Sequence, residues 1–132
     1  MCDGWRCNRS KQKRVLREAG LSYTLYTSSD PFGITQSILM NYMYAKYYET
    51  PTASTVTRRI EYSTRITGLT QPQDIFFRQG SANNPTQGVR YQTTMNTTTV
   101  WHPGSESIHL AVTLYFTNGG TLQAEQTISS NF

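Results

Sequence analysis

Few residues of this sequence have the types and spacing that catalysis needs. The chain lacks the phosphate-binding patterns G-x-x-x-x-G-K-[ST] and G-x-G-x-x-G, the zinc pattern H-E-x-x-H and the nucleophile pattern G-x-S-x-G. General acid–base catalysis usually uses a histidine or a carboxylate in a pocket. His102 and Glu106 are near enough to meet across a predicted turn, but the other acids are scattered along the chain. We therefore expect no catalytic residues and a protein that is not an enzyme.

Two cysteines lie near the N-terminus, in the segment Cys2-Asp3-Gly4-Trp5-Arg6-Cys7. A structural zinc site needs about four ligands, and the histidines, His102 and His109, do not have the spacing of a zinc finger. The sequence therefore predicts no metal and no other cofactor. In a reducing compartment these thiols are expected to be free.

The positive charge is concentrated in the first 17 residues. They carry six Lys and Arg and one acid, a net charge of +5, whereas the other 115 residues carry six Lys and Arg and seven acids, a net charge of −1. A basic segment of this kind neutralises phosphates, and a nearby tryptophan can stack on unpaired bases. The sequence predicts RNA or single-stranded DNA as a partner, bound by Trp5, Arg6, Arg9, Lys11, Lys13, Arg14 and Arg17. The alternative is a solvated terminus that adds to solubility.

Two helices are predicted before the long strands. Ser10 is a suitable N-cap and Gly20 a suitable stop for a short helix over Lys11–Ala19. The segment Ile34–Glu49 is apolar at nearly every helical angle, which is typical of a helix buried on two faces. We predict a main helix over about 34–48, with an oligomer interface formed by Met40, Met43, Tyr44 and Tyr47. The many tyrosines leave a strand as the alternative.

Alternation with a period of two begins after the predicted main helix. From Thr55 to Ile66 apolar and polar side chains alternate, and Arg58 falls on the apolar side, where it would need a carboxylate, a subunit partner or an anionic ligand. Further strands are predicted at 22–27, 75–77, 89–101 and 108–116. The apolar residues that follow share a face with the last strand if Asn118-Gly119-Gly120 forms a three-residue loop with Gly120 in the left-handed conformation.

Length and composition agree with one small domain. The chain has 132 residues, of which 36% are hydrophobic, and it contains nine tyrosines. We predict a β-rich α+β fold in which four to six antiparallel strands form a curved sheet or small sandwich packed on the main helix. Residues 1–20 form the basic N-terminal segment, which includes the short helix, and residues 21–132 form the domain.

Sequence features that direct proteins to membranes or out of the cell are missing. No apolar run is long enough for a membrane helix, and no secretory signal opens the chain. We therefore expect an intracellular, non-secreted protein without a membrane partner. The sequence does not identify the compartment, and the virion is one candidate.

A basic N-terminal segment on a neutral, threonine-rich β domain resembles, in layout alone, the small viral coat proteins. The main hypothesis is therefore a structural protein that self-associates into a homo-oligomer and binds nucleic acid through its N-terminal segment. Two alternatives stay open. In the first, the helix lies on the curved sheet over a pocket for a small ligand or substrate, lined by Tyr42, Tyr62, Tyr91, Trp101 and Phe116. In the second, Trp101 or Tyr115 is the stacking platform of a carbohydrate-binding module.

Overall fold

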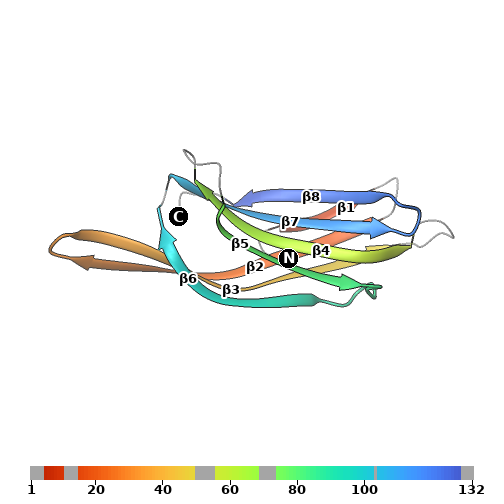
Figure 1. Ribbon diagram of the computed structural model, residues 1–132, viewed down its shortest axis with the longest axis horizontal. Helices are drawn as coiled ribbons and strands as arrows, with labels where there is room; N and C mark the ends of the chain where they lie inside the picture. The colour runs from red at the N-terminus through yellow and green to blue at the C-terminus, as the bar shows by residue number, and fades with distance from the viewer. Residues whose placement is uncertain (1–4, 11–14, 50–55, 69–73, 103, 129–132) are drawn as a thin grey trace.

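All regular structure in the described part of the chain is β-strand. The computed structural model describes residues 5–10, 15–49, 56–68, 74–102 and 104–128, and for 5–10 and 15–17 it describes the backbone. The strands form two antiparallel sheets (Figure 1), sheet A with the order β1-β2-β3-β6 and sheet B with the order β5-β4-β7-β8. Their bounds are β1 (Trp5–Ser10), β2 (Val15–Asp30), β3 (Gly33–Glu49), β4 (Thr57–Gly68), β5 (Asp74–Asn83), β6 (Tyr91–Trp101), β7 (Glu106–Phe116) and β8 (Thr121–Ile128).

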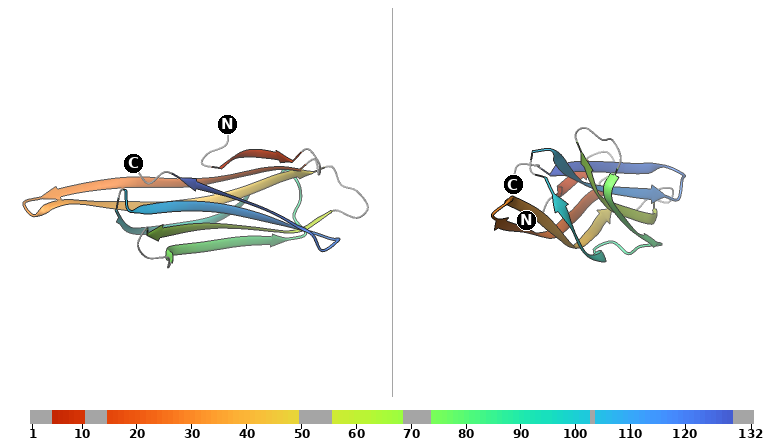
Figure 2. Two further views of the ribbon diagram at one scale, coloured as in Figure 1. Left: turned by 90° about the horizontal axis from the view of Figure 1, so that it is seen from above. Right: turned by 60° about the vertical axis from the view of Figure 1, so that its left-hand side comes forward.

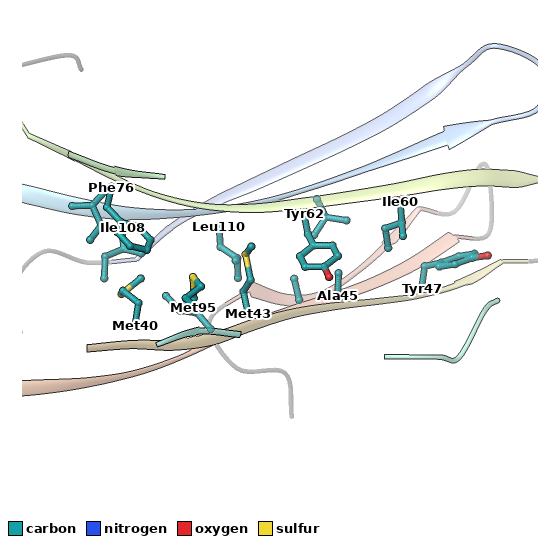
Figure 3. Packing of buried hydrophobic residues seen from close by; sticks show 14 of the residues in the cluster. Met40, Met43, Ala45, Tyr47, Ile60, Tyr62, Phe76, Met95, Ile108 and Leu110 are labelled. Atoms are coloured by element: carbon teal, nitrogen blue, oxygen red, sulfur yellow. The ribbon is translucent and has the colours of Figure 1, made fainter. Parts of the chain in front are cut away.

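The two sheets pack face to face around one apolar core. Figure 3 shows Met43 and Tyr47 of β3 pointing toward Ile60 and Tyr62 of β4, with side chains of both sheets between the ribbons. This is the packing of a β-sandwich, in which the inner faces of two sheets supply the buried residues. The core cluster consists of Ala19, Leu21, Ile38, Met40, Met43, Ala45, Tyr47, Ile60, Tyr62, Ile66, Phe76, Met95, Trp101, Ile108, Leu110, Val112, Leu114 and Phe116.

The predicted α+β fold is wrong, because the described residues contain no helix. The segment of the predicted main helix, 34–48, lies in β3. Of the predicted N-terminal helix, residues 15–19 lie in β2, and residues 11–14 are outside the described part. The strand alternative, which the tyrosines favour, is therefore the correct one for 34–48.

A bulge in β3 explains why its sequence resembles that of a helix. Ile38 and Met40 are buried before the bulge, and Met43 and Ala45 are buried after it. The inward positions are thus two residues apart on each side of the bulge but three apart across it. The extra residue is Asn41, which has no counterpart on β2. A mixture of two- and three-residue spacings fits a helical period of 3.6 nearly as well as a strand period of 2.

The neighbouring strand β6 adapts to this bulge with an irregularity of its own. Met40 pairs with Thr97 and Tyr42 with Thr94, so β6 has one residue more than β3 in this interval. Asn96 accommodates the difference with a left-handed backbone, φ 45°. Asparagine tolerates this conformation better than most residues other than glycine.

Because every pairing is antiparallel, the strand ends collect at two ends of the sandwich. At one of them β2, β4 and β6 end and β3, β5 and β7 begin; we call it the arm end. At the opposite end β3, β5 and β7 end and β4, β6 and β8 begin; we call it the basic end (Figure 1). The pairing β2-β3-β6 and β5-β4-β7-β8 corresponds to that of strands A-B-E and C′-C-F-G in immunoglobulin-type sandwiches, an architecture that hosts many functions and implies none.

β2 and β3 continue beyond the rest of the sandwich as a two-stranded hairpin. The pairing of β3 with β6 ends at Gln36, yet β3 stays paired with β2 as far as Gly33, which faces Asp30. Figures 1 and 2 show this hairpin projecting past the other strands. We call residues 26–35 the arm. Its most exposed apolar side chains are Tyr26, Phe32 and Ile34.

The pairing registers correct two local predictions. Arg58 is exposed rather than on the apolar face, because the register of β4 against β7 shifts at this residue. In the β7–β8 hairpin the apolar residues share a face as predicted, but Leu114 pairs with Leu122, which moves the turn one residue toward the N-terminus. Accordingly, Gly119 and not Gly120 has the left-handed backbone, φ 89°.

The left-handed residue of β6 gives a first test of the fold. Asn96→Val is expected to lower the free energy of unfolding by about 1–3 kcal/mol, because a β-branched residue is strained at positive φ. Asn96→Gly is expected to be tolerated, since glycine has no Cβ. Urea denaturation of both variants, with Thr98→Val as the control at an extended and exposed position, measures the difference. Equal stability of Asn96→Val and Thr98→Val would contradict the bulge.

Candidate functional site

Two tyrosines and an arginine form a stacked group on the outer face of sheet A. Tyr42 and Tyr44 belong to β3 and lie on the side opposite the inward-pointing Met43. The guanidinium of Arg90, which directly precedes β6, lies 3.6 Å from the ring centroid of Tyr44 and 5.6 Å from that of Tyr42. These distances are within the range of cation–π contacts. We call Tyr42, Tyr44 and Arg90 the tyrosine–arginine cluster.

Hydrogen bonds to β3 and β6 hold the β5–β6 loop that carries the arginine. The Tyr47 hydroxyl donates to the backbone oxygen of Pro85 at 2.8 Å, and the N–H of Gly88 donates to the backbone oxygen of Tyr47 at 2.8 Å. The N–H of Thr86 donates to the Tyr91 hydroxyl at 2.7 Å. Because Tyr47 packs in the core, this loop is fixed to the interior of the sandwich, and the position of the cluster is fixed with it.

A glycine makes room for the central ring of the cluster. Gly20 of β2 pairs with Tyr44, and a Cβ on Gly20 would collide with the tyrosine ring. The aromatic ring thus covers a position where the neighbouring strand has no side chain, which compensates for the poor strand propensity of glycine. Tyr44 is only 5% exposed as a result, and the arginine stacked on it is exposed.

A second cation lies next to the cluster on the same face. The Lys46 ammonium is 3.5 Å from a carboxylate oxygen of Glu18 and 5.6 Å from the ring centroid of Tyr48. A hydrogen bond with Tyr48 and the charge of Glu18 raise the pKa of Lys46 above its usual value. Lys46 is therefore charged at neutral pH, but it already has a carboxylate partner.

Arg90 differs from Lys46 in this respect. Within the described residues, no hydrogen bond and no carboxylate contact is found for its guanidinium, which instead contacts the two tyrosine rings. Arg59, by comparison, pairs with Glu61 at 3.0 Å and with Asn83 at 2.7 Å. The Arg90 guanidinium therefore combines a fixed orientation with N–H donors that can bind a ligand.

A hollow of about 250 Å³ adjoins the cluster. It is lined by Leu21, Ser22, Tyr23, Tyr42 and Tyr44. Pockets for drug-sized ligands usually measure about 300–1,000 Å³. The hollow is therefore suited to part of a larger molecule, such as one flat ring.

The predicted nucleic-acid-binding residues lie at the opposite edge of the same sheet. Trp5, Arg6 and Arg9 belong to β1 and Arg17 to β2, while Lys11, Lys13 and Arg14 lie outside the described residues. The registers place Trp5, Ala19, Ala45 and Tyr91 in one row across sheet A. Three strand spacings of about 4.8 Å separate the ends of this row, about 14 Å in all. The basic segment and Arg90 thus lie at the two edges of one narrow face.

Three of the four residues predicted to form an oligomer interface lie inside the sandwich. Met40, Met43 and Tyr47 point into the core of a single chain, and their burial needs no second subunit. Tyr44 points outward and is covered by the arginine of the cluster.

Half of the residues named for the two alternative functions are internal. Tyr62, Trp101 and Phe116, predicted to line a pocket, fill the core, and the helix on which that pocket depended is strand β3. Trp101 is 1% exposed, which leaves no ring face for a sugar, and Tyr115 is half-buried beside Arg58, 5.8 Å from its ring.

His102 and Glu106 do meet across the β6–β7 turn. The backbone N–H of His102 donates to a Glu106 oxygen at 2.7 Å, and the ring nitrogen Nδ1 lies 3.2 Å from the same oxygen. The buried carboxylate thereby satisfies a backbone donor of the turn, which is a structural role.

Sequence reasoning did not single out Arg90. It precedes a threonine-rich strand, and its contact with Tyr44 depends on the pairing of residues that are almost fifty positions apart. The one indication in the sequence is the glycine at position 88, because glycine is common where a loop needs a left-handed backbone, and Gly88 does have φ 79° in the structure.

No protein-family model, curated protein or solved structure matches this chain. In the described ranges, no three or more His, Cys, Asp and Glu side chains are grouped so that they could hold a metal ion. The same part of the chain contains no helix that is long and apolar enough to cross a membrane.

The stacking geometry predicts an energetic coupling between Tyr44 and Arg90. A double-mutant cycle with Tyr44→Leu and Arg90→Gln is expected to give a coupling of about 0.5–1 kcal/mol in the free energy of unfolding. The same cycle with Tyr42→Leu is expected to give a smaller value, because the guanidinium is farther from that ring. Urea denaturation of the single and double variants measures both. Equal couplings, or none, would contradict the stacked arrangement.

Proposed function

We propose that this chain is a non-enzymatic structural protein that binds single-stranded nucleic acid, RNA or DNA, on the outer face of sheet A. The observation that carries the proposal is the guanidinium of Arg90, which is stacked on Tyr44 and has no carboxylate partner among the described residues. Arginine held in this way matches the geometry of phosphate oxygens. Tyrosine rings beside it provide stacking surfaces for bases.

The distribution of charge supports binding at the end of the sandwich where the cluster lies. Among the Lys and Arg of the described residues, only Arg65 and Arg78 lie in the half of the sandwich toward the arm end. The other described cations lie in the half toward the basic end, together with the cluster. A concentration of cations at one end attracts a polyanion and orients it as it approaches.

The width of the face also fits a single strand. The basic segment and Arg90 lie about 14 Å apart across three strand spacings. A flexible single strand can cross such a face with phosphates at both edges and bases on Tyr42 and the exposed Tyr48. The layout that the sequence shares with small viral coat proteins is compatible with this role and remains a likeness of layout.

Removal of the arginine tests the proposal. Arg90→Ala is expected to weaken binding of a labelled oligothymidylate or oligouridylate of about 20 nucleotides by about tenfold, since a charged hydrogen bond contributes about 1.5 kcal/mol. The affinity of Arg90→Lys is expected to lie between those of the wild type and Arg90→Ala, because lysine keeps the charge but lacks the forked N–H donors of arginine. Fluorescence anisotropy measures both affinities.

A matched control for this experiment is Arg78→Ala. Arg78 is also exposed and stacked, 4.8 Å from the ring centroid of Phe76, but it belongs to β5 in sheet B. Arg78→Ala changes the net charge by the same amount as Arg90→Ala, and its affinity is expected to stay within about twofold of the wild-type affinity. Equal losses for the two variants, or no binding by the wild-type chain at low salt, would contradict the proposal.

The basic segment is tested by the salt dependence. Lys11→Gln with Lys13→Gln is expected to reduce the slope of log affinity against log salt by about 0.7 for each phosphate that the variant no longer neutralises. Arg65→Gln with Arg78→Gln removes the same charge from the other half of the sandwich and is expected to leave the slope almost unchanged. Titrations at several salt concentrations measure the slopes. Identical slopes for the two double variants would exclude the basic segment from the site.

A further inference from the structure

A hollow of about 420 Å³ lies on the outer face of sheet B. This volume is within the range of sites that bind small ligands. The outer faces of sheets A and B lie on opposite sides of the sandwich, so this hollow is separate from the tyrosine–arginine cluster. Its lining comes from the three neighbouring strands β4, β7 and β8 and consists of Ser63, Arg65, Ala111, Thr113, Gln123, Ala124 and Glu125.

The strand register places short side chains in the middle of the hollow and long ones around them. Ser63 pairs with Ala111, and Ala111 pairs with Glu125, so a serine and an alanine lie side by side in one row across the sheet. Arg65 and Gln123 project from the same face in the neighbouring rows, since side chains two residues apart share a face. The hollow therefore follows from the register and from the sizes of these side chains.

Polar side chains elsewhere on this face are paired with one another. Glu61 accepts hydrogen bonds from Arg59 at 3.0 Å and from Gln79 at 2.9 Å, one on each carboxylate oxygen. The ring nitrogen Nε2 of His109 lies 2.9 Å from the Thr67 hydroxyl. These pairs satisfy the polar groups of the sheet itself.

The polar groups that line the hollow are different in this respect. Within the described ranges, no side-chain hydrogen bond is found for Ser63, Thr113 or Gln123. Oxygen Oε1 of Glu125 lies 3.3 Å from Nδ1 of His109, and no contact within the same ranges is found for its Oε2. Hydroxyl, amide and carboxylate groups that can bind a ligand therefore surround the floor of the hollow.

Charges of opposite sign lie on two sides of the hollow. The guanidinium of Arg65 is positioned 5.3 Å from the ring centroid of Phe77, and the side chain of Glu125 is 54% exposed. Their strands are two strand spacings apart, about 10 Å. An anionic ligand would meet the carboxylate and a cationic ligand the guanidinium. A neutral polar ligand avoids both repulsions and can hydrogen-bond to both groups.

We propose that this hollow binds one sugar ring of a neutral saccharide. A sugar carries several hydroxyls, and each of them both donates and accepts hydrogen bonds. This matches a lining that contains a guanidinium, which only donates, a carboxylate, which only accepts, and hydroxyl and amide groups, which do both. The C–H groups of the ring would lie against the methyl group of Ala111. Neither Trp101 nor Tyr115, the stacking residues of the predicted carbohydrate-binding module, lines the hollow.

An NMR titration tests the class of ligand. Glucose, galactose, mannose and N-acetylglucosamine are added separately to the isotopically labelled chain at up to about 50 mM, because a shallow polar site is expected to have a Kd of about 1–10 mM. At least one sugar is expected to shift the amide signals of Ser63, Ala111, Thr113, Gln123 and Glu125 together. No shift with any of the four sugars overturns the proposal.

Glycine is the competing probe in the same titration. Its carboxylate and ammonium groups could bind Arg65 and Glu125 without any hydroxyl. Shifts of the lining residues with glycine but with none of the sugars overturn the saccharide class. None of these measurements uses nucleic acid, so their outcome does not depend on the proposed function.

Substitutions test the location of the site. Ala111→Leu fills the floor of the hollow and is expected to weaken binding of the responding sugar by at least about tenfold. Ser81→Leu is the matched control and is expected to stay within about twofold of the wild-type affinity. Ser81 is an exposed small residue on the same face, opposite Glu61, and does not line the hollow. Equal affinities of the two leucine variants overturn the proposal.

A second variant keeps the shape of the hollow. Glu125→Gln replaces a half-exposed side chain by one of the same size, so the fold is expected to persist. Binding of the responding sugar is expected to weaken by about three- to tenfold, because the variant loses a charged hydrogen-bond acceptor. The same NMR titration measures this loss, and an unchanged affinity of Glu125→Gln overturns the proposal.

Discussion

The rest of the structure depends on one constraint, the change of side-chain direction at the bulge of β3. Before Asn41 the even-numbered residues point into the core, and after it the odd-numbered ones do, so both Met40 and Met43 are buried. The side chain of Asn41 stays on the outer face, within 3.3–3.4 Å of hydroxyls of β2. Without the extra residue, only one half of β3 could bury its apolar side chains, and the other half would expose them. The same change turns Tyr44 outward, where Arg90 can reach it.

The core and the outer face are therefore connected through neighbouring residues of one strand. Tyr47 packs in the core and binds the β5–β6 loop through both its hydroxyl and its backbone oxygen. The loop in turn sets the position of Arg90 over Tyr44. Binding residues are effective when their conformations are fixed before the ligand arrives. A loop held by core residues can supply this for Arg90, which we propose to bind phosphate.

The sequence was sufficient for the regular strands and insufficient where bulges occur. The alternation of Ile60, Tyr62 and Ile66 predicted β4, and that of Ile108, Leu110 and Leu114 predicted β7, because neither run contains an extra residue. The segment 34–48 was misassigned because the bulge breaks its alternation. The concentration of charge in residues 1–17 was visible in the sequence. Its position on the same sheet as Arg90 was not, since this arrangement arises from the pairing of β3 with both β2 and β6.

Photo-cross-linking to a single strand tests whether nucleic acid binds on the outer face of sheet A, as we propose. An oligonucleotide that contains 4-thiouridine would be irradiated with the wild-type chain, and the modified peptides would be identified by mass spectrometry. The account predicts adducts on Tyr42, Tyr48 and neighbouring positions of the basic segment. Adducts confined to aromatic residues of sheet B, such as the exposed Phe77, would contradict it.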